Sequence, residues 1–148
     1  MMKWHLRFYE LAKLVSSWSK DPNTQVGAVI TSPFKNIVSV GYNGFNSHVL
    51  NEESLYNQIT RDEKRNRTIH AELNAIFNAA KNGASVKDCS IYVTHPSCSN
   101  CALAIIQSGV KAVIVPKVNL LHNDWLKSNM RAKELFNEAG VSYLELDV

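Results

Sequence analysis

The sequence predicts an α/β domain in which helices cover both faces of a mixed β-sheet. Apolar residues recur every three or four positions from Trp4 to Trp18, which is typical of an amphipathic helix. Two β-rich runs, 25–31 and 37–42, follow with a short loop between them, and this pattern indicates a hairpin. From residue 70 onwards helical and strand-like segments alternate, which favours strands joined by helices that pack on the sheet.

The remaining elements follow from local residue choice. Asn43 to Asn46 are typical turn residues, and the polar stretch from Glu52 to Arg67 is expected to form a partly exposed helix or loop. A helix is expected from about His70 to the stop at Gly83. The later helices are expected at 101–107 and 132–139, and the later strands at 90–94, 112–115 and 141–146.

Length and composition fit a small soluble enzyme. The chain has 148 residues, contains no linker or repeat, and is expected to form one domain over residues 1–148. No apolar run approaches the roughly 18 residues of a membrane span, and the charged start of the chain lacks the apolar core of a signal peptide. Three cysteines argue against a disulfide framework and for a reducing compartment, so we expect a cytoplasmic protein.

Charge does not indicate nucleic-acid binding, because the formal net charge is only +3. Most of the local excess lies in the run from Arg61 to Arg67, which alternates in sign before it ends basic. For this run we favour a solvated helix face over a phosphate-binding patch.

The most informative residues are His70-Ala71-Glu72 and, further along, Cys98-Ser99-Asn100-Cys101. One imidazole and two thiolates suit Zn²⁺, and a catalytic zinc takes three protein ligands and leaves a fourth position for water. Glu72 is then the proton carrier, because zinc lowers the pKa of its water from about 15.7 towards about 7. The alternative is a structural zinc knuckle closed by His95, which would leave Glu72 without a role.

Both halves of this motif are expected at helix N-termini. Unpaired backbone N–H groups and the helix dipole favour a thiolate over a thiol there, and metal binding benefits from that deprotonation. Cys89 lies outside the motif at the start of a predicted strand, where we expect a small buried apolar residue.

The chain resembles the zinc-dependent deoxycytidylate (dCMP) deaminases of the cytidine deaminase superfamily. The resemblance is carried by ordered blocks at 19–28, 41–44, 70–76, 91–94, 98–101, 106–110 and 136–141. It implies a three-layer α/β/α fold with a five-stranded mixed sheet, and a homo-oligomer of two to six subunits. It also implies hydrolysis of dCMP to dUMP for thymidylate synthesis. The small size resembles viral or phage members, for which the compartment would be the host cytoplasm.

The family's functional residues match particular positions of this chain. His70, Cys98 and Cys101 match the zinc ligands, and Glu72 matches the residue that moves the proton when zinc hydroxide attacks C4 of cytosine and ammonia leaves. The substrate-binding positions are matched by Ser19, Lys20, Asn23, Asn43, Ala71 and Thr94. His95 stands where relatives often have an apolar residue, and we expect it beside the pocket as a further candidate for contact with the phosphate or base. The implied ligand is a mononucleotide, with Mg²⁺ as a companion to its phosphates, rather than a nucleic acid or a membrane.

Two departures from the family pattern stand out. Ser97 occupies the position before the first Cys where the signature has Pro, and Pro96 lies one residue earlier. After Gly44 the chain reads Phe-Asn-Ser-His, without the Pro-x-Gly loop that longer members use for activation by dCTP, so we expect weaker dCTP dependence. A tRNA adenosine deaminase and a non-catalytic zinc module remain as alternatives, and acceptance of dCTP or 5-substituted dCMP stays open.

Overall fold

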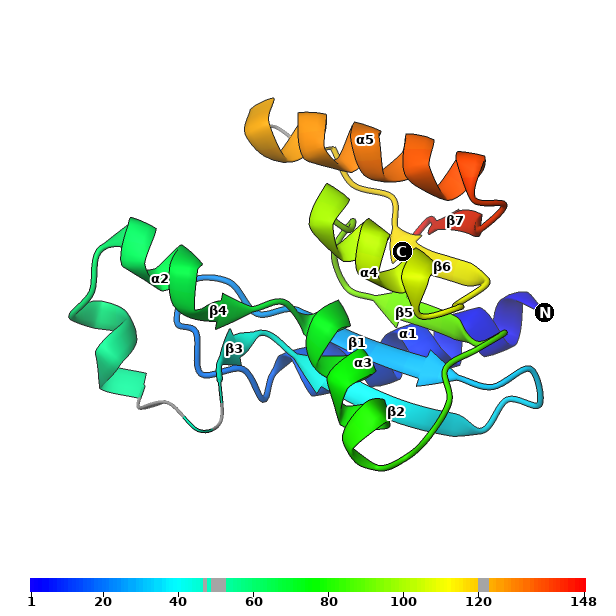
Figure 1. The fold of residues 1–148 in the computed structure, drawn as a ribbon, viewed down its shortest axis with the longest axis horizontal. Coiled ribbons are helices and arrows are strands. Elements are labelled where there is room, and N and C mark those ends of the chain that lie inside the picture. Colours follow the sequence, from blue (N-terminus) through cyan, green and yellow to red (C-terminus); the bar gives the residue numbers. More distant parts are fainter. Residues whose placement is uncertain (47, 49–52, 120–122) are drawn as a thin grey trace.

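The computed structural model describes residues 1–46, 48, 53–119 and 123–148, and its centre is a five-stranded sheet (Figure 1). The strands are β1 (Gly27–Thr31), β2 (Ile37–Tyr42), β5 (Ser90–Val93), β6 (Ala112–Pro116) and β7 (Ser142–Leu146), in the order β2-β1-β5-β6-β7. β1 pairs antiparallel with both β2 and β5, whereas β5, β6 and β7 are parallel. The sheet is therefore mixed, as the sequence predicts.

Helices cover both faces of this sheet and make three layers (Figure 1). On one face α1 (Met2–Ser16) packs Phe8 and Val15 against Val29 and Ile114 of the sheet. The other face is covered by α3 (Ala71–Lys81), α4 (Ser99–Gln107) and α5 (Asn123–Glu138). Successive strand residues point to opposite faces, so each central strand contributes to both apolar cores. Both faces of the sheet are therefore buried.

A smaller lobe projects from the end of the sheet that carries β1 and β2 (Figure 1). It contains β3 (Gly44–Phe45), the 3₁₀ helix η1 (Glu53–Asn57), α2 (Arg61–Arg67) and β4 (Thr68–Ile69), with β3 paired antiparallel to β4. The ring of Tyr56 stacks on Phe45 at 4.1 Å between centroids, and its hydroxyl accepts a hydrogen bond from the Phe45 N–H. These contacts fix α2 directly before His70.

Several element boundaries differ from the sequence prediction. Gly44 and Phe45 pair as a short strand instead of forming a turn, because Thr68 and Ile69 present a complementary edge. Trp18 lies beyond the end of α1 and is half exposed, so it does not belong to the buried helix face. The last helix begins at Asn123 rather than at residue 132. Its first turns mix Trp125, Leu126 and Met130 with polar residues, so they give a weaker apolar pattern than residues 132–139.

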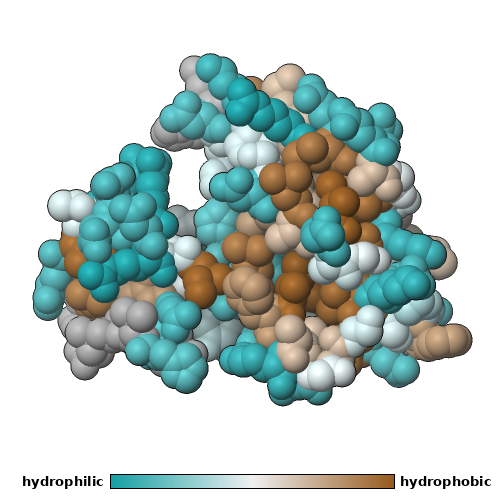
Figure 2. All heavy atoms as spheres, in the orientation of Figure 1, coloured by the Kyte–Doolittle hydropathy of each residue, from teal (hydrophilic) through white to brown (hydrophobic). Residues whose placement is uncertain are grey.

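The surface is divided by polarity. Figure 2 shows a hydrophilic lobe at α2 and apolar side chains gathered over α3, α4 and the neighbouring strands. Phe77 of α3 and Leu103 of α4 are about half exposed. Across the described residues, we find no helix with the length and apolarity that a bilayer crossing requires.

Candidate metal centre and active-site cavity

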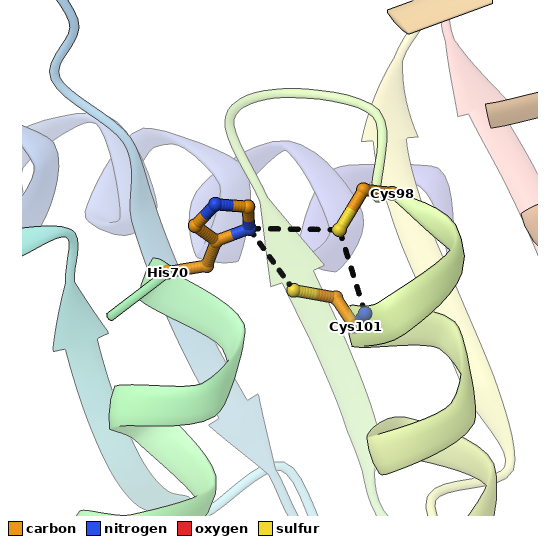
Figure 3. Close-up of side chains that lie close together, drawn as sticks. All are labelled: His70, Cys98 and Cys101. Carbon is orange, nitrogen blue, oxygen red and sulfur yellow. Dashed lines mark hydrogen bonds between the residues drawn. The ribbon is translucent and has the colours of Figure 1, made fainter. Parts of the chain in front are cut away.

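Two helix N-termini bring three metal-ligating side chains together (Figure 3). His70 is the N-cap of α3 and Cys98 is the N-cap of α4, while Cys101 lies in the first turn of α4. His70 Nδ1 lies 3.5 Å from Cys98 Sγ and 3.3 Å from Cys101 Sγ. Both ligand groups thus occupy the helix positions that the sequence predicts.

The spacing of these three atoms fits a tetrahedral zinc ion. With Zn–S of about 2.3 Å and Zn–N of about 2.0 Å at tetrahedral angles, sulfur and nitrogen ligands should be about 3.5 Å apart. The observed nitrogen–sulfur distances are 3.3 and 3.5 Å, and all three ligand atoms lie within 4.8 Å of one another. Among the described residues, His95 is not part of this group, so the geometry favours three protein ligands over a closed four-ligand site.

The electrostatics of the group couple metal binding to the release of protons. The hydrogen bond from Cys101 is the largest effect on Cys98 and lowers the pKa of its thiol to about 4. The same shared proton and burial raise the pKa of Cys101. The hydrogen bond with Cys98 raises the pKa of His70. The metal-free site therefore holds protons that a metal ion would displace.

Glu72 lies beside the ligands in the first turn of α3 and is only 4% exposed. Burial raises the pKa of its carboxyl, while the neighbouring His70 acts in the opposite direction. A carboxyl with a raised pKa can both accept and return a proton near neutral pH. Glu72 is not one of the clustered ligands and is free for that role.

A cavity of about 430 Å³ opens over this centre. Its wall includes His70, Ala71, Glu72, Asn43 and His95, which are five of the positions predicted from the sequence. Figure 2 shows the molecule hollowed between the α2 lobe and the helices at the top of the view. The predicted metal ligand and proton carrier therefore lie on the wall of a space of the size that holds small ligands.

Aromatic rings form part of the cavity wall. The ring of Trp125, in the first turn of α5, packs edge-on against His95 at 4.9 Å and lies 6.2 Å from His70. His95 Nδ1 donates a hydrogen bond to the Pro96 carbonyl oxygen at 3.0 Å. The position of His95 is thus fixed by its own turn and by Trp125.

Asn43 holds two backbone segments together at the cavity. Its side-chain oxygen accepts a hydrogen bond from the Val26 N–H at 2.8 Å, and its amide nitrogen donates to the Thr24 carbonyl at 2.8 Å. Ser19 donates its hydroxyl proton to the Asn43 backbone carbonyl, also at 2.8 Å. Asn43 keeps one amide hydrogen beyond these bonds, so it can brace the loop and still donate to a ligand.

Other predicted substrate contacts lie off the cavity wall. Ser19 is buried behind Asn43, Asn23 is exposed, and Lys20 is exposed outside the lining. Thr94 uses its hydroxyl oxygen to accept a hydrogen bond from the Gly27 N–H at 3.0 Å. The structure therefore brings Ala71, Asn43 and His95 to the cavity and does not bring these four side chains to it.

The basic residues of the wall come from α2 and not from the loop around Lys20. Arg61, Lys64 and Arg65 line the cavity, and Arg61 and Arg65 are exposed to solvent there, so this solvated side of α2 also borders the cavity. The spacing i, i+3 and i+4 of these three residues is the sequence signal for a basic helix face, because residues so spaced lie on the same side of a helix. Asp124 also lies on the wall, near Trp125 in sequence.

Ser97 is completely buried next to the first metal-ligating cysteine. Its carbonyl oxygen accepts a hydrogen bond from Asn129 Nδ2 of α5 at 2.9 Å, and that amide group also lies 3.4 Å from the Tyr143 hydroxyl. The turn that precedes Cys98 is thus held by the last helix of the chain.

Comparison with known proteins agrees with this geometry. Residues 2–117 match the model of the cytidine and deoxycytidylate deaminase zinc-binding region. A protein named as an uncharacterised deaminase in the luxG 3′ region of Aliivibrio fischeri is 42% identical, over 99% of this chain and 97% of its own length. The deoxycytidylate deaminase of Homo sapiens is 39% identical over 96% of this chain and 79% of its own length.

The fold also matches solved structures. The dCMP deaminase of cyanophage S-TIM5, determined in complex with dCMP and dUMP, superposes with a TM-score of 0.77 at 24% identity over 95% of each chain. Its apo form gives a TM-score of 0.75. The match to the family model and the identity to the relatives lead to one conclusion: this chain belongs to the cytidine and deoxycytidylate deaminase family.

Proposed function

We propose that this protein is a zinc-dependent hydrolase that converts dCMP and water to dUMP and ammonia. The observation that carries the proposal is the set of His70, Cys98 and Cys101 with buried Glu72 beside it at the cavity. The substrate is inferred from the deoxycytidylate deaminases to which the chain is 38–40% identical.

The site residues have distinct roles in this reaction. A zinc ion held by His70, Cys98 and Cys101 would make a water molecule acidic enough to act as a nucleophile near neutral pH. Glu72 would take one proton from the attacking water and deliver it to N3 of cytosine, and would then pass the second proton of that water to the amine, which leaves C4 as ammonia. Burial keeps this carboxyl out of bulk water and raises its pKa, so Glu72 takes up a proton more readily than an exposed glutamate does.

The cavity supports a mononucleotide as the ligand. Its volume of about 430 Å³ lies in the range of small-molecule sites, and Trp125 and His95 provide ring surfaces at its wall. We assign Asn43, which lines the cavity, as a hydrogen-bond donor to the sugar. We also propose that the protein forms a homo-oligomer and that zinc is its resident ion. Deamination of dCMP would then not require Mg²⁺. Light scattering after size-exclusion chromatography and assays with chelators of each ion test these points.

The central test is release of ammonia from zinc-loaded protein. The panel is dCMP, deoxycytidine, CMP, dCTP, 5-methyl-dCMP and a tRNA anticodon stem-loop. We expect dCMP to have the highest kcat/KM of the panel. Preference for the tRNA would replace this proposal with the tRNA deaminase alternative, and no ammonia from any substrate in a fully zinc-loaded sample would leave only metal binding.

A further inference from the structure

Helix α2 separates its charged side chains into two faces. Arg61, Lys64, Arg65 and Thr68 follow the spacing i, i+3, i+4 and i+7, and all four line the cavity. On the remaining surface of the helix, Glu63 pairs with Arg67 at 2.6 Å. The charge pattern that looks mixed in the sequence therefore presents a basic stripe to the cavity.

Lys64 is held in place by a carboxylate. Its ammonium group lies 2.8 Å from both oxygens of Asp21, whose side chain is 2% exposed. Asp21 also accepts backbone hydrogen bonds from Asn23 at 2.9 Å and Thr24 at 3.2 Å. This ion pair fastens α2 to the loop that precedes β1 and neutralises one of the basic charges.

Among the described residues, no carboxylate pairs with the charges of Arg61 and Arg65. Both side chains are exposed at the cavity. The other acidic groups on the wall are Glu72, which is buried at the metal centre, and Asp124 of α5. The α2 side of the cavity therefore carries an excess of positive charge.

The position of the stripe suits one part of a nucleotide. α2 runs into β4, and β4 runs directly into His70, so the stripe begins close to the metal centre and extends away from it by up to about 10 Å. A base that reacts at the metal centre must leave its sugar and phosphate elsewhere in the same cavity. The α2 stripe provides guanidinium groups there, and their planar forks match phosphate oxygens.

We propose that Arg61 and Arg65, with Lys64 fixed by Asp21, form the subsite for the 5′-phosphate of the nucleotide. This inference rests on the proposed deaminase function and assigns its selectivity for a nucleotide over a nucleoside to α2. Thr68, at the end of the same face, already donates its hydroxyl proton to the Lys64 carbonyl oxygen at 2.7 Å, so it adds no donor to this subsite.

Binding of the reaction product separates phosphate recognition from catalysis. The affinities of zinc-loaded protein for dUMP and for deoxyuridine are measured by calorimetry at two salt concentrations. We expect Arg61→Gln and Arg65→Gln each to weaken dUMP binding about tenfold or more, because each removes charge-assisted hydrogen bonds, and to leave deoxyuridine binding unchanged. The salt dependence of dUMP binding should fall in both variants.

The matched control is Arg67→Gln, which removes the same charge from the other face of α2, where Arg67 pairs with Glu63. It should leave both affinities unchanged, and Arg65→Lys should recover part of the loss. Equal weakening of dUMP by all three Gln variants would overturn the subsite, as would unchanged dUMP binding in Arg61→Gln and Arg65→Gln. If dUMP binding follows the expected pattern while dCMP is not deaminated, the proposed reaction fails and the phosphate subsite stands.

Discussion

Gly41 of β2 lies so close to α3 that a Cβ atom on it would stand 2.3 Å from the Ala75 nitrogen and 2.6 Å from the Ala71 carbonyl oxygen. No side chain fits between the strand and the helix at this point. Since α3 carries His70 and Glu72 at its N-terminus, this contact sets how far the metal ligand and the proton carrier lie from the sheet.

Gly41→Ala should therefore affect stability and metal binding together. Overpacking of this kind costs about 1–3 kcal/mol, and moving α3 outwards displaces His70 from the two cysteines. Thermal unfolding and bound zinc per chain measure the two effects. Gly44→Ala is the control, because its Cβ would meet only the Tyr56 hydroxyl at 3.5 Å. A Gly41→Ala protein with normal stability and zinc content would show that the contact relaxes without consequence.

Glu72→Gln should retain zinc and lose turnover. Glu72 is not one of the clustered ligands, and general acid–base catalysis contributes about 10² to 10⁴ to the rate. Single-turnover rates and metal analysis, measured on the same samples of Glu72→Gln and of the unchanged protein, test both expectations. Zinc loss with near-normal turnover after reconstitution would exclude the assignment.

The same substitution should change how stability depends on pH. Burial raises the pKa of Glu72 above its unfolded value, so the native state binds this proton more tightly than the unfolded state does. The carboxyl therefore lowers the stability of the metal-free protein as pH rises from its unfolded pKa, about 4.3, through its folded pKa. Gln cannot ionise, so the stability advantage of Glu72→Gln should grow over that window in urea titrations. A difference in the free energy of unfolding between the two proteins that does not change with pH would contradict this prediction.

Cys98→Ala should release the metal, whereas Cys89→Ala should not. Cys98 and Cys101 lie at the start of α4 and, with His70, join two helix N-termini through the ion. Cys89 is buried but belongs to no ligand group among the described residues. Zinc content and melting temperature distinguish the two variants. Full zinc occupancy in Cys98→Ala would place the site elsewhere.

Zinc affinity should increase with pH and binding should release protons. The pKa of His70 is raised by its hydrogen bond with Cys98, and that of Cys101 is raised by the proton it shares with Cys98. Both groups must lose a proton to bind zinc, so a higher pH favours the complex. Calorimetry between pH 6 and 8, in buffers of different ionisation enthalpy, counts the protons. Affinity that does not change with pH would mean that the free site is already deprotonated.

Velocity against dCMP should be close to hyperbolic without added nucleotide. The Pro-x-Gly sequence of the activation loop is missing after Gly44, and part of this stretch, Ser47 included, lies outside the described residues. An effector that lacks a differential binding site cannot shift a conformational equilibrium. Initial rates with and without dCTP and Mg²⁺ test this. Sigmoidal kinetics that dCTP converts to hyperbolic kinetics would disprove it.

Local patterns in the sequence predict most of the fold and the metal centre. The ligand motif and the helix starts at His70 and Cys98 follow from spacing and capping, which are local, and the structure places them as predicted. The alternation of apolar residues likewise predicts the hairpin and the parallel strands. Interactions between residues close together in the sequence are sufficient to determine these elements.

The cavity wall is different because distant contacts determine it. Pairing between β3 and β4 turns α2 so that Arg61 and Arg65 face the cavity, and Asp21 holds Lys64 across 43 positions of sequence. The i, i+3, i+4 spacing groups the basic residues on one face of α2, but no local pattern shows that this face borders the cavity. The sequence prediction also missed the start of α5, which brings Trp125 to the wall, because the apolar residues of its first turns stand among polar ones.

The bond from Asn129 to the Ser97 carbonyl has a consequence for synthesis of the chain. A growing polypeptide displays both zinc-binding cysteines well before α5 leaves the ribosome. During that interval the turn before Cys98 lacks its support from Asn129, and the aromatic wall supplied by Trp125 is absent. The three candidate metal ligands are therefore synthesised before the helix that supports their turn and completes the cavity wall.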